Sequence, residues 1–208
     1  MIQSCLITGV GGQGTILMSR LIGTAAILKG LDVRGTETIG MAQRGGSVVS
    51  HIRMGQNIPS PLIPRGKADL IIAFEPAEAV RVYPFLSPTG RMLVLDRMIL
   101  PVSGMLGENT YESREMISFL KAYLSYPSEE RLARKDEGDV LTVLNGDELI
   151  QKCGSSRVLN TALLGAAVKK NFFPFTEDNI LAAFKERIPP KFLDINILAF
   201  NTGKELAG

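Results

Sequence analysis

The chain opens with an apolar strand pattern that runs through a glycine-rich turn into a helix pattern. The run Cys5-Leu6-Ile7 leads directly into residues 9–14 (GVGGQG), and a broad apolar face follows over residues 14–29. Glycines permit backbone torsions closed to other residues, so the chain can turn sharply here. The spacing G-x-G-x-x-G after a strand is that of a loop that carries a dinucleotide pyrophosphate on a helix N-terminus. This segment therefore predicts a β-strand, a tight turn and a helix at the start of an α/β protein.

Strand and helix patterns alternate along the first two thirds of the chain. Strands are predicted at 2–8, 33–38, 47–53, 69–74, 91–95 and 139–144, and helices at 14–29, 76–83 and 112–125. The run at 69–74 (DLIIAF) lacks polar alternation, which is typical of a parallel strand buried on both faces. Further helices are predicted at 147–153, 157–170, 177–187 and 191–206. The alternation predicts a Rossmann-like α/β layered fold, with a mostly parallel or mixed sheet and a helical C-terminal part.

The remaining segments connect these elements within one domain. Residues 55–67 hold three prolines and two glycines and are predicted as a loop, and residues 87–90 (SPTG) as a turn. Residues 104–138 form a polar insertion around the helix at 112–125. No linker divides the chain, so residues 1–208 are predicted to form a single domain.

The composition argues against several classes of protein. The 208 residues carry a formal net charge of +2, which gives no support for nucleic-acid or membrane-surface binding. No apolar segment approaches the roughly 20 residues of a membrane helix. The N-terminus lacks the basic segment of a secretory signal. We expect a cytoplasmic protein.

Two cysteines and one histidine limit the metal chemistry. Cys5 and Cys153 are too few for a four-thiolate iron–sulfur cluster or a structural zinc site. We interpret both as buried or incidental thiols. His51 lies within the predicted strand 47–53 and is interpreted as a hydrogen-bonding residue rather than a catalyst.

Three interpretations of the glycine turn stay open. Its backbone N–H groups and the positive end of the helix dipole can bind an anion or a nucleotide-like ligand. The glycines can instead serve only a tight turn, or a subunit contact. A dinucleotide site also needs an acidic side chain at the end of the second strand; Asp32 comes too early, and Glu37 is the only candidate. The candidate site residues of the turn are Gly11, Gly12, Gln13 and Gly14.

A second glycine-rich segment, residues 40–47 (GMAQRGGS), follows the second predicted strand. Arginine offers a fixed fork of donors for carboxylate or phosphate, and glutamine offers both a donor and an acceptor. A loop that closes over an anion is therefore the sharper interpretation, and a glycine-rich hairpin with a solvated arginine is the alternative. The candidate site residues of this segment are Gln43, Arg44, Gly45 and Gly46.

Glu75 is a further candidate site residue, because it follows the predicted strand 69–74. Open parallel sheets bind ligands at the carboxyl ends of their strands. The structural alternative is that Glu75 supplies a favourable negative charge at the start of the next helix.

Several spaced motifs, spread over nearly the whole chain, carry a family resemblance. They are GVGGQG at 9–14, GMAQRGGSVVSHIRMG at 40–55, SPLIP at 60–64, ADLIIAFE at 68–75, Asn160 before LLG at 163–165, and a tail with Asn196, Ala199-Phe200 and Gly203. Together they resemble the gamma domain of 2-oxoacid:ferredoxin oxidoreductases, and within that family the beta subunits of indolepyruvate ferredoxin oxidoreductases. The polar insertion at 104–138 departs from the pattern.

The resemblance implies an accessory subunit that holds no cofactor firmly by itself. In this family, thiamine diphosphate with Mg and the 4Fe-4S clusters sit mainly on a larger partner subunit, and the holoenzyme uses CoA and ferredoxin. The triplet Asn145-Gly146-Asp147 is the nearest approach to a thiamine magnesium loop, and a turn followed by a helix cap explains it.

The function implied by the resemblance is help in the oxidative decarboxylation of a 2-oxoacid to the acyl-CoA. An aryl pyruvate such as indolepyruvate is the expected substrate of the hetero-oligomer, and the isolated chain is expected to be inactive. Two alternatives remain: a stand-alone NAD- or FAD-binding Rossmann oxidoreductase, and a purely structural assembly subunit.

Overall fold

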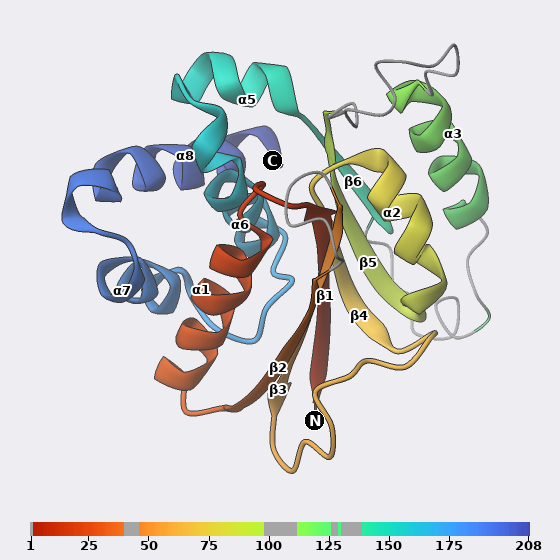
Figure 1. Ribbon diagram of the computed structural model, residues 1–208, viewed down its shortest axis with the longest axis horizontal. Helices are drawn as coiled ribbons and strands as arrows, with labels where there is room; N and C mark the ends of the chain where they lie inside the picture. The colour runs from red at the N-terminus through yellow and green to blue at the C-terminus, as the bar shows by residue number, and fades with distance from the viewer. Residues whose placement is uncertain (1, 40–45, 98–111, 126–128, 130–138) are drawn as a thin grey trace.

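A mixed six-stranded sheet forms the centre of the molecule, in the order β2-β3-β1-β4-β5-β6 (Figure 1). The computed structural model describes residues 2–39, 46–97, 112–125, 129 and 139–208. The strands are β1 (Gln3–Val10), β2 (Asp32–Ile39), β3 (Ser47–Gly55), β4 (Ala68–Ala73), β5 (Leu86–Asp96) and β6 (Leu141–Asn145). β1, β4, β5 and β6 run parallel to one another, whereas β3 is antiparallel to both β1 and β2. The predicted α/β fold with a mixed sheet is confirmed.

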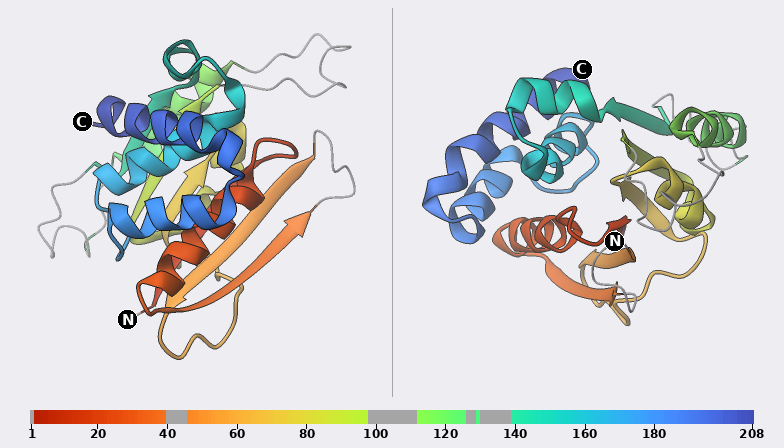
Figure 2. Two further views of the ribbon diagram at one scale, coloured as in Figure 1. Left: turned by 90° about the vertical axis from the view of Figure 1, so that its left-hand side faces the viewer. Right: turned by 45° about the horizontal axis from the view of Figure 1, so that its top comes forward.

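Helices cover both faces of this sheet, as Figures 1 and 2 show. One face carries α1 (Thr15–Leu28), α5 (Gly146–Cys153), α6 (Leu159–Lys169), α7 (Glu177–Arg187) and α8 (Leu193–Leu206). The other face carries α2 (Pro76–Val82) and α3 (Ser113–Leu124). Short 3₁₀ turns lie at η1 (Tyr83–Phe85), η3 (Ser156–Val158) and η4 (Pro190–Phe192). Each predicted helix in the described part of the chain is present, and no end is shifted by more than two residues.

Two hydrophobic cores follow from this layering. Alternate residues of β1 and β4, such as Cys5, Ile7 and Ile72, face the larger core under α1 and α6–α8. Their neighbours, such as Leu6 and Ile71, face a smaller core under α2 and α3. Burial on both faces explains why DLIIAF reads as a continuous apolar run.

The hairpin β2–β3 sets this sheet apart from a plain Rossmann sheet. Only residues 40–46 join β2 to β3, and a parallel crossover needs a dozen or more residues. β3 therefore returns antiparallel and occupies the place beside β1, with Leu6 opposite His51 and Val10 opposite Ser47. β2 is displaced to the outer edge, which the left panel of Figure 2 shows.

One predicted turn is wrong. Residues 87–90 do not form a separate turn, because β5 begins at Leu86 and continues through them. The pairing of β5 with β4 shifts register between Ala68 and Leu70, and a Cβ on Gly90 would lie 2.5 Å from the Ala68 carbonyl oxygen. The Pro-Thr-Gly segment thus serves an irregular strand that approaches its neighbour closely.

Helices α6 and α8 cross at two glycines, one on each helix. A Cβ on Gly165 would lie 1.9 Å from the Phe200 carbonyl oxygen, and a Cβ on Gly203 would lie 1.8 Å from the Ala162 carbonyl oxygen. Backbone therefore touches backbone at this crossing. The contact fixes α6, whose first turn reaches the glycine turn after β1, because Asn160 lies against Gly14.

In the part of the chain that the structure describes, no helix is long and apolar enough to cross a membrane.

Candidate functional site

The glycine turn lies at the carboxyl edge of the parallel strands, between β1 and α1. Gly12 and Gly14 have φ angles of +101° and +89°, in the region that favours glycine. Gly14 is the N-cap of α1, and no side chain caps the helix there. The predicted strand-to-helix turn is confirmed, and it leaves the start of a 14-residue helix without a capping side chain.

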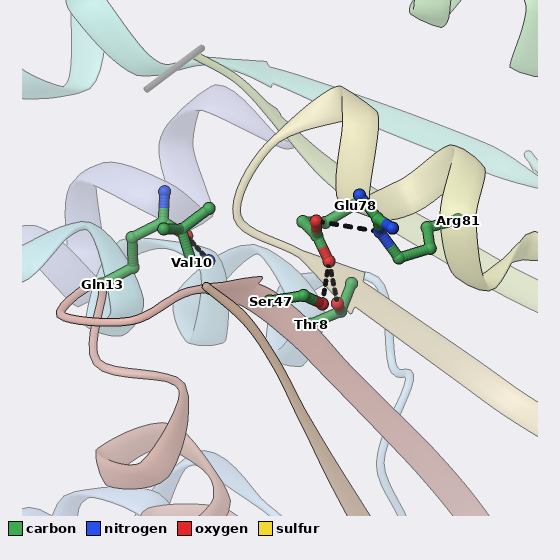
Figure 3. Close-up of polar contacts among 6 residues, drawn as sticks. All are labelled: Thr8, Val10, Gln13, Ser47, Glu78 and Arg81. Atoms are coloured by element: carbon green, nitrogen blue, oxygen red, sulfur yellow. Dashed lines mark hydrogen bonds and ion pairs between the residues drawn. The ribbon is translucent and has the colours of Figure 1, made fainter. Parts of the chain in front are cut away.

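Gln13 holds the turn from within. The Val10 N–H donates to Gln13 Oε1 at 2.6 Å, and the Gln13 N–H donates to the Val10 carbonyl oxygen at 3.2 Å. Figure 3 shows the Gln13 side chain turned back toward Val10. Gln13, at the helix entrance, thus supplies a hydrogen-bond acceptor that the Val10 N–H at the end of β1 would otherwise lack.

The two glycine-rich segments meet in the structure. The Gly11 N–H donates to the Gly46 carbonyl oxygen at 2.9 Å, so the start of β3 is tied to the turn. Gln43, Arg44 and Gly45 lie outside the described residues. The two segments therefore lie side by side at Gly11 and Gly46.

Glu75 lies at the end of β4 and is the N-cap of α2. It is 2% exposed, and its side chain does not cap that helix. Its position at the carboxyl edge is as predicted from the sequence.

A second buried carboxylate, Glu78, was not predicted. Its Oε2 accepts hydrogen bonds from Thr8 Oγ1 at 3.3 Å and from Ser47 Oγ at 2.5 Å. Its Oε1 accepts from Arg81 Nε at 3.1 Å. Figure 3 shows these side chains converging from β1, β3 and α2, and Glu78 is only 4% exposed. Glu78 therefore joins the three elements that surround the glycine turn.

A sequence signal for Glu78 existed. Glu75, Glu78, Ala79 and Val82 are all buried, and they follow the i, i+3, i+4, i+7 spacing of one helix face. A carboxylate on an otherwise apolar face needs a partner, because an unpaired buried charge is costly. That argument predicts a polar partner, although it does not identify Thr8 or Ser47.

Glu37 does not occupy the place of a ribose-binding acid. In the dinucleotide fold that acid ends the strand next to β1. Here β3 lies between β1 and β2, so Glu37 pairs with Ser50, which in turn pairs with Ile7. One strand spacing, about 4.8 Å, is added to the distance that the ligand would have to span. The topology thus disfavours the NAD or FAD hypothesis.

His51 has a structural environment. It is 7% exposed, and its Nδ1 accepts a hydrogen bond from the Ile63 N–H at 3.2 Å. Its ring meets Phe85 edge to face, with centroids 6.1 Å apart. Burial lowers the pKa of His51, which favours the neutral ring that can accept this bond. His51 thus anchors the loop between β3 and β4.

The two cysteines are free thiols in buried positions, as the sequence predicts. Burial, with a smaller contribution from Asp69, raises the pKa of Cys5, so the reactive thiolate is disfavoured. Within the described ranges, no group of three His, Cys, Asp or Glu side chains could hold a metal ion.

Asn145 caps α5. Its Oδ1 accepts hydrogen bonds from the N–H groups of Asp147 and Glu148, each at 3.0 Å. The cap interpretation of the Asn-Gly-Asp triplet is confirmed, and the triplet resembles a helix start rather than a magnesium loop.

Comparisons with known proteins agree with this architecture. The family model described as pyruvate ferredoxin/flavodoxin oxidoreductase matches residues 4–206. The chain is 33% identical over 202 residues to indolepyruvate oxidoreductase subunit IorB of Thermococcus kodakarensis, covering 97% of this chain and 94% of that protein. It is 37% identical over 199 residues to subunit IorB of Archaeoglobus fulgidus, covering 95% and 92%.

A solved structure supports the fold. The gamma subunit of a keto/oxoacid ferredoxin oxidoreductase from Geobacter sulfurreducens aligns with a TM-score of 0.65 and 19% identity, covering 99% of this chain and 98% of that one. The family resemblance predicted from the spaced glycine motifs is confirmed, and the chain belongs to the pyruvate ferredoxin/flavodoxin oxidoreductase family.

Proposed function

We propose that this chain is the accessory subunit of an indolepyruvate ferredoxin oxidoreductase that acts in the cytoplasm. The larger partner would carry thiamine diphosphate, Mg and the 4Fe-4S clusters, and the holoenzyme would deliver electrons to ferredoxin and an acyl group to CoA. The identity to subunits of indolepyruvate oxidoreductases, over nearly the full length of both chains, supports this substrate class. The chain would act as one gamma-type domain, with the insertion at 104–138 as a departure.

The single observation that carries the proposed site is the junction of the glycine turn with β3. The Gly11 N–H donates a hydrogen bond to the Gly46 carbonyl oxygen. Beside this bond, the Glu78 carboxylate accepts hydrogen bonds from Thr8 of β1 and Ser47 of β3. We propose that this carboxyl-edge surface faces the active site of the partner, where it excludes water and contacts CoA. Its members would be residues 11–14, Gln43, Arg44, Gly45, Gly46 and Glu75. The hard redox chemistry would belong to the cofactors of the partner.

The substitution Gly12→Ala tests this proposal in the reconstituted complex. Gly12 has a φ of +101°, and nothing lies within 4 Å of an added Cβ, so the variant strains the backbone without a clash. Gly30→Ala is the matched control, because Gly30 has a φ of +85°, is equally open and lies at the far end of α1.

We expect Gly12→Ala to raise the KM for CoA or to lower indolepyruvate-dependent ferredoxin reduction at least tenfold, while Gly30→Ala leaves both close to wild type. Size-exclusion chromatography would report assembly. Loss of assembly in Gly12→Ala alone would favour the purely structural subunit. Equal effects of the two variants would contradict a site at the turn.

A further inference from the structure

The start of α1 leaves a set of backbone donors unused. The Val10, Gly11 and Gln13 N–H groups have acceptors within the protein. Among the described residues, none accepts from the N–H groups of Gly12, Gly14, Thr15 or Ile16. These groups lie at the positive end of a helix of 14 residues.

A buried side chain from a distant part of the chain lies beside these donors. Asn160 is 3% exposed and stands in the first turn of α6. Its Oδ1 accepts a hydrogen bond from the Thr161 N–H at 2.9 Å. Its Nδ2 lies 2.9 Å from the position that a Cβ on Gly14 would occupy, and it has no partner in the described part of the chain. Nδ2 is not one of the described side-chain atoms that are both sealed from solvent and unpartnered, so it reaches the surface and can donate to a ligand there.

Two features keep the position next to Asn160 open. Gly14 carries no side chain, and a Cβ there would press on the Asn160 amide. The α6–α8 glycine crossing also fixes α6 close by. An isolated helix start would not hold a ligand by itself, but here a fixed side-chain donor meets the helix start.

We propose that Asn160 Nδ2 and the N–H groups of Gly14, Thr15 and Ile16 form a binding site for a phosphate or diphosphate group. All of these groups are donors, and the buried carboxylate of Glu78 is occupied by Thr8, Ser47 and Arg81. Converging donors at a helix N-terminus select an anion with several acceptor oxygens. This inference rests on the proposed function, which supplies two sources of such a group in the complex: CoA and thiamine diphosphate.

The substitution Asn160→Asp separates a ligand role from a structural one. The aspartate has nearly the same shape and can still accept from the Thr161 N–H, and its negative charge is favourable in the first turn of α6. A purely structural role therefore predicts unchanged or higher stability and unchanged function. A site role predicts repulsion of the anion. Asn57→Asp is the charge-matched control, because Asn57 is exposed and follows β3 at the opposite edge of the sheet.

The first measurement is an NMR titration of the full chain with inorganic pyrophosphate. We expect shifts of the Gly14, Thr15 and Ile16 amides and of the Asn160 side-chain NH₂, with a Kd at least tenfold higher in Asn160→Asp and unchanged in Asn57→Asp. Shifts that scatter over surface lysines, or a Kd unaffected by Asn160→Asp, would overturn the site.

The second measurement uses the assembled complex. An increased KM for CoA in Asn160→Asp would identify CoA as the source of the phosphate, and weakened binding of thiamine diphosphate would identify the cofactor of the partner. Wild-type values for both ligands would overturn the inference, while assembly and indolepyruvate turnover would still test the proposed function separately.

Discussion

At the scale of single residues, the buried carboxylate of Glu78 is the feature with the clearest energetic consequence. It is 4% exposed and accepts hydrogen bonds from two hydroxyls and from Arg81, whose own side chain is 65% exposed. Replacing the carboxylate by the amide of glutamine removes the negative charge that strengthens all three bonds, and the two hydroxyls must turn to accept from the new NH₂ group. Hydrogen bonds to a charged group contribute about 1.5–3 kcal/mol, against about 0.5–1.5 kcal/mol for neutral ones.

We therefore expect Glu78→Gln to lower the free energy of unfolding in urea by about 1–3 kcal/mol. Glu115→Gln is the matched control, because Glu115 occupies the same first-turn position in α3 and is exposed. Glu115→Gln removes the same favourable charge from the start of a helix but breaks no buried hydrogen bond. Its free energy of unfolding should therefore fall by less than about 1 kcal/mol. Equal losses in the two variants would show that the Thr8 and Ser47 contacts contribute nothing.

His51 predicts a pH dependence of stability. Burial lowers its pKa below the ordinary 6.5. At a pH between the folded and the unfolded pKa, His51 is therefore protonated in the unfolded chain and neutral in the folded one. The stability that comes from neutral His51 is present above pH 6.5 and is lost progressively as the pH falls toward the folded pKa. In His51→Asn an amide oxygen can replace Nδ1 as acceptor for Ile63, and no group titrates there.

The measurement is the free energy of unfolding of the wild type and His51→Asn between pH 7.5 and 5. We expect the wild type to lose more stability than the variant over this range. Because the chain has a single histidine, the difference between the two curves isolates this side chain. Parallel curves would contradict the depressed pKa.

At the scale of elements, the α6–α8 crossing is where packing has the least freedom. Gly165→Ala would place a Cβ 1.9 Å from a backbone oxygen of α8, which cannot move without shifting the helix. We expect a loss of about 3 kcal/mol or more in the free energy of unfolding. Gly23→Ala, in the interior of α1, is the control, because its nearest contact would be an ordinary 3.4 Å from the Ile52 side chain.

For Gly23→Ala we expect the free energy of unfolding to rise by up to about 1 kcal/mol, since alanine favours the helix more than glycine does. Urea denaturation of both variants checks the pair. A Gly165→Ala protein as stable as Gly23→Ala would mean that α6 and α8 do not meet at the distance described.

Most elements could be predicted from local patterns, because each strand and helix has its own periodicity. The strand pattern at 47–53 and the helix pattern at 14–29 are examples. The place of β3 between β1 and β2 could not be predicted in the same way, since strand pairing joins residues far apart in the chain. The partners of Glu78 could not be predicted for the same reason, because Thr8 and Ser47 lie 70 and 31 residues away in the sequence.

At the scale of the whole molecule, the interposed strand separates this fold from the dinucleotide-binding proteins that share its glycine spacing. The start of β3 is bound to Gly11, and Glu37 stands one strand further out. We therefore expect no heat of NAD binding when the full chain is titrated by calorimetry. Binding that is tight and lost in Glu37→Ala would contradict this, and would support the stand-alone oxidoreductase.

The glycine crossing of α6 and α8 also limits how relatives of this chain can diverge. Gly203 abuts Ala162, and Asn160 in the same turn of α6 abuts Gly14. A larger residue at Gly203 on α8 would push α6 away from α8 and shift Asn160 relative to the turn after β1. Positions 14, 160, 165 and 203 are therefore expected to change together during evolution, as one inherited unit, although they are spread over almost the full length of the chain.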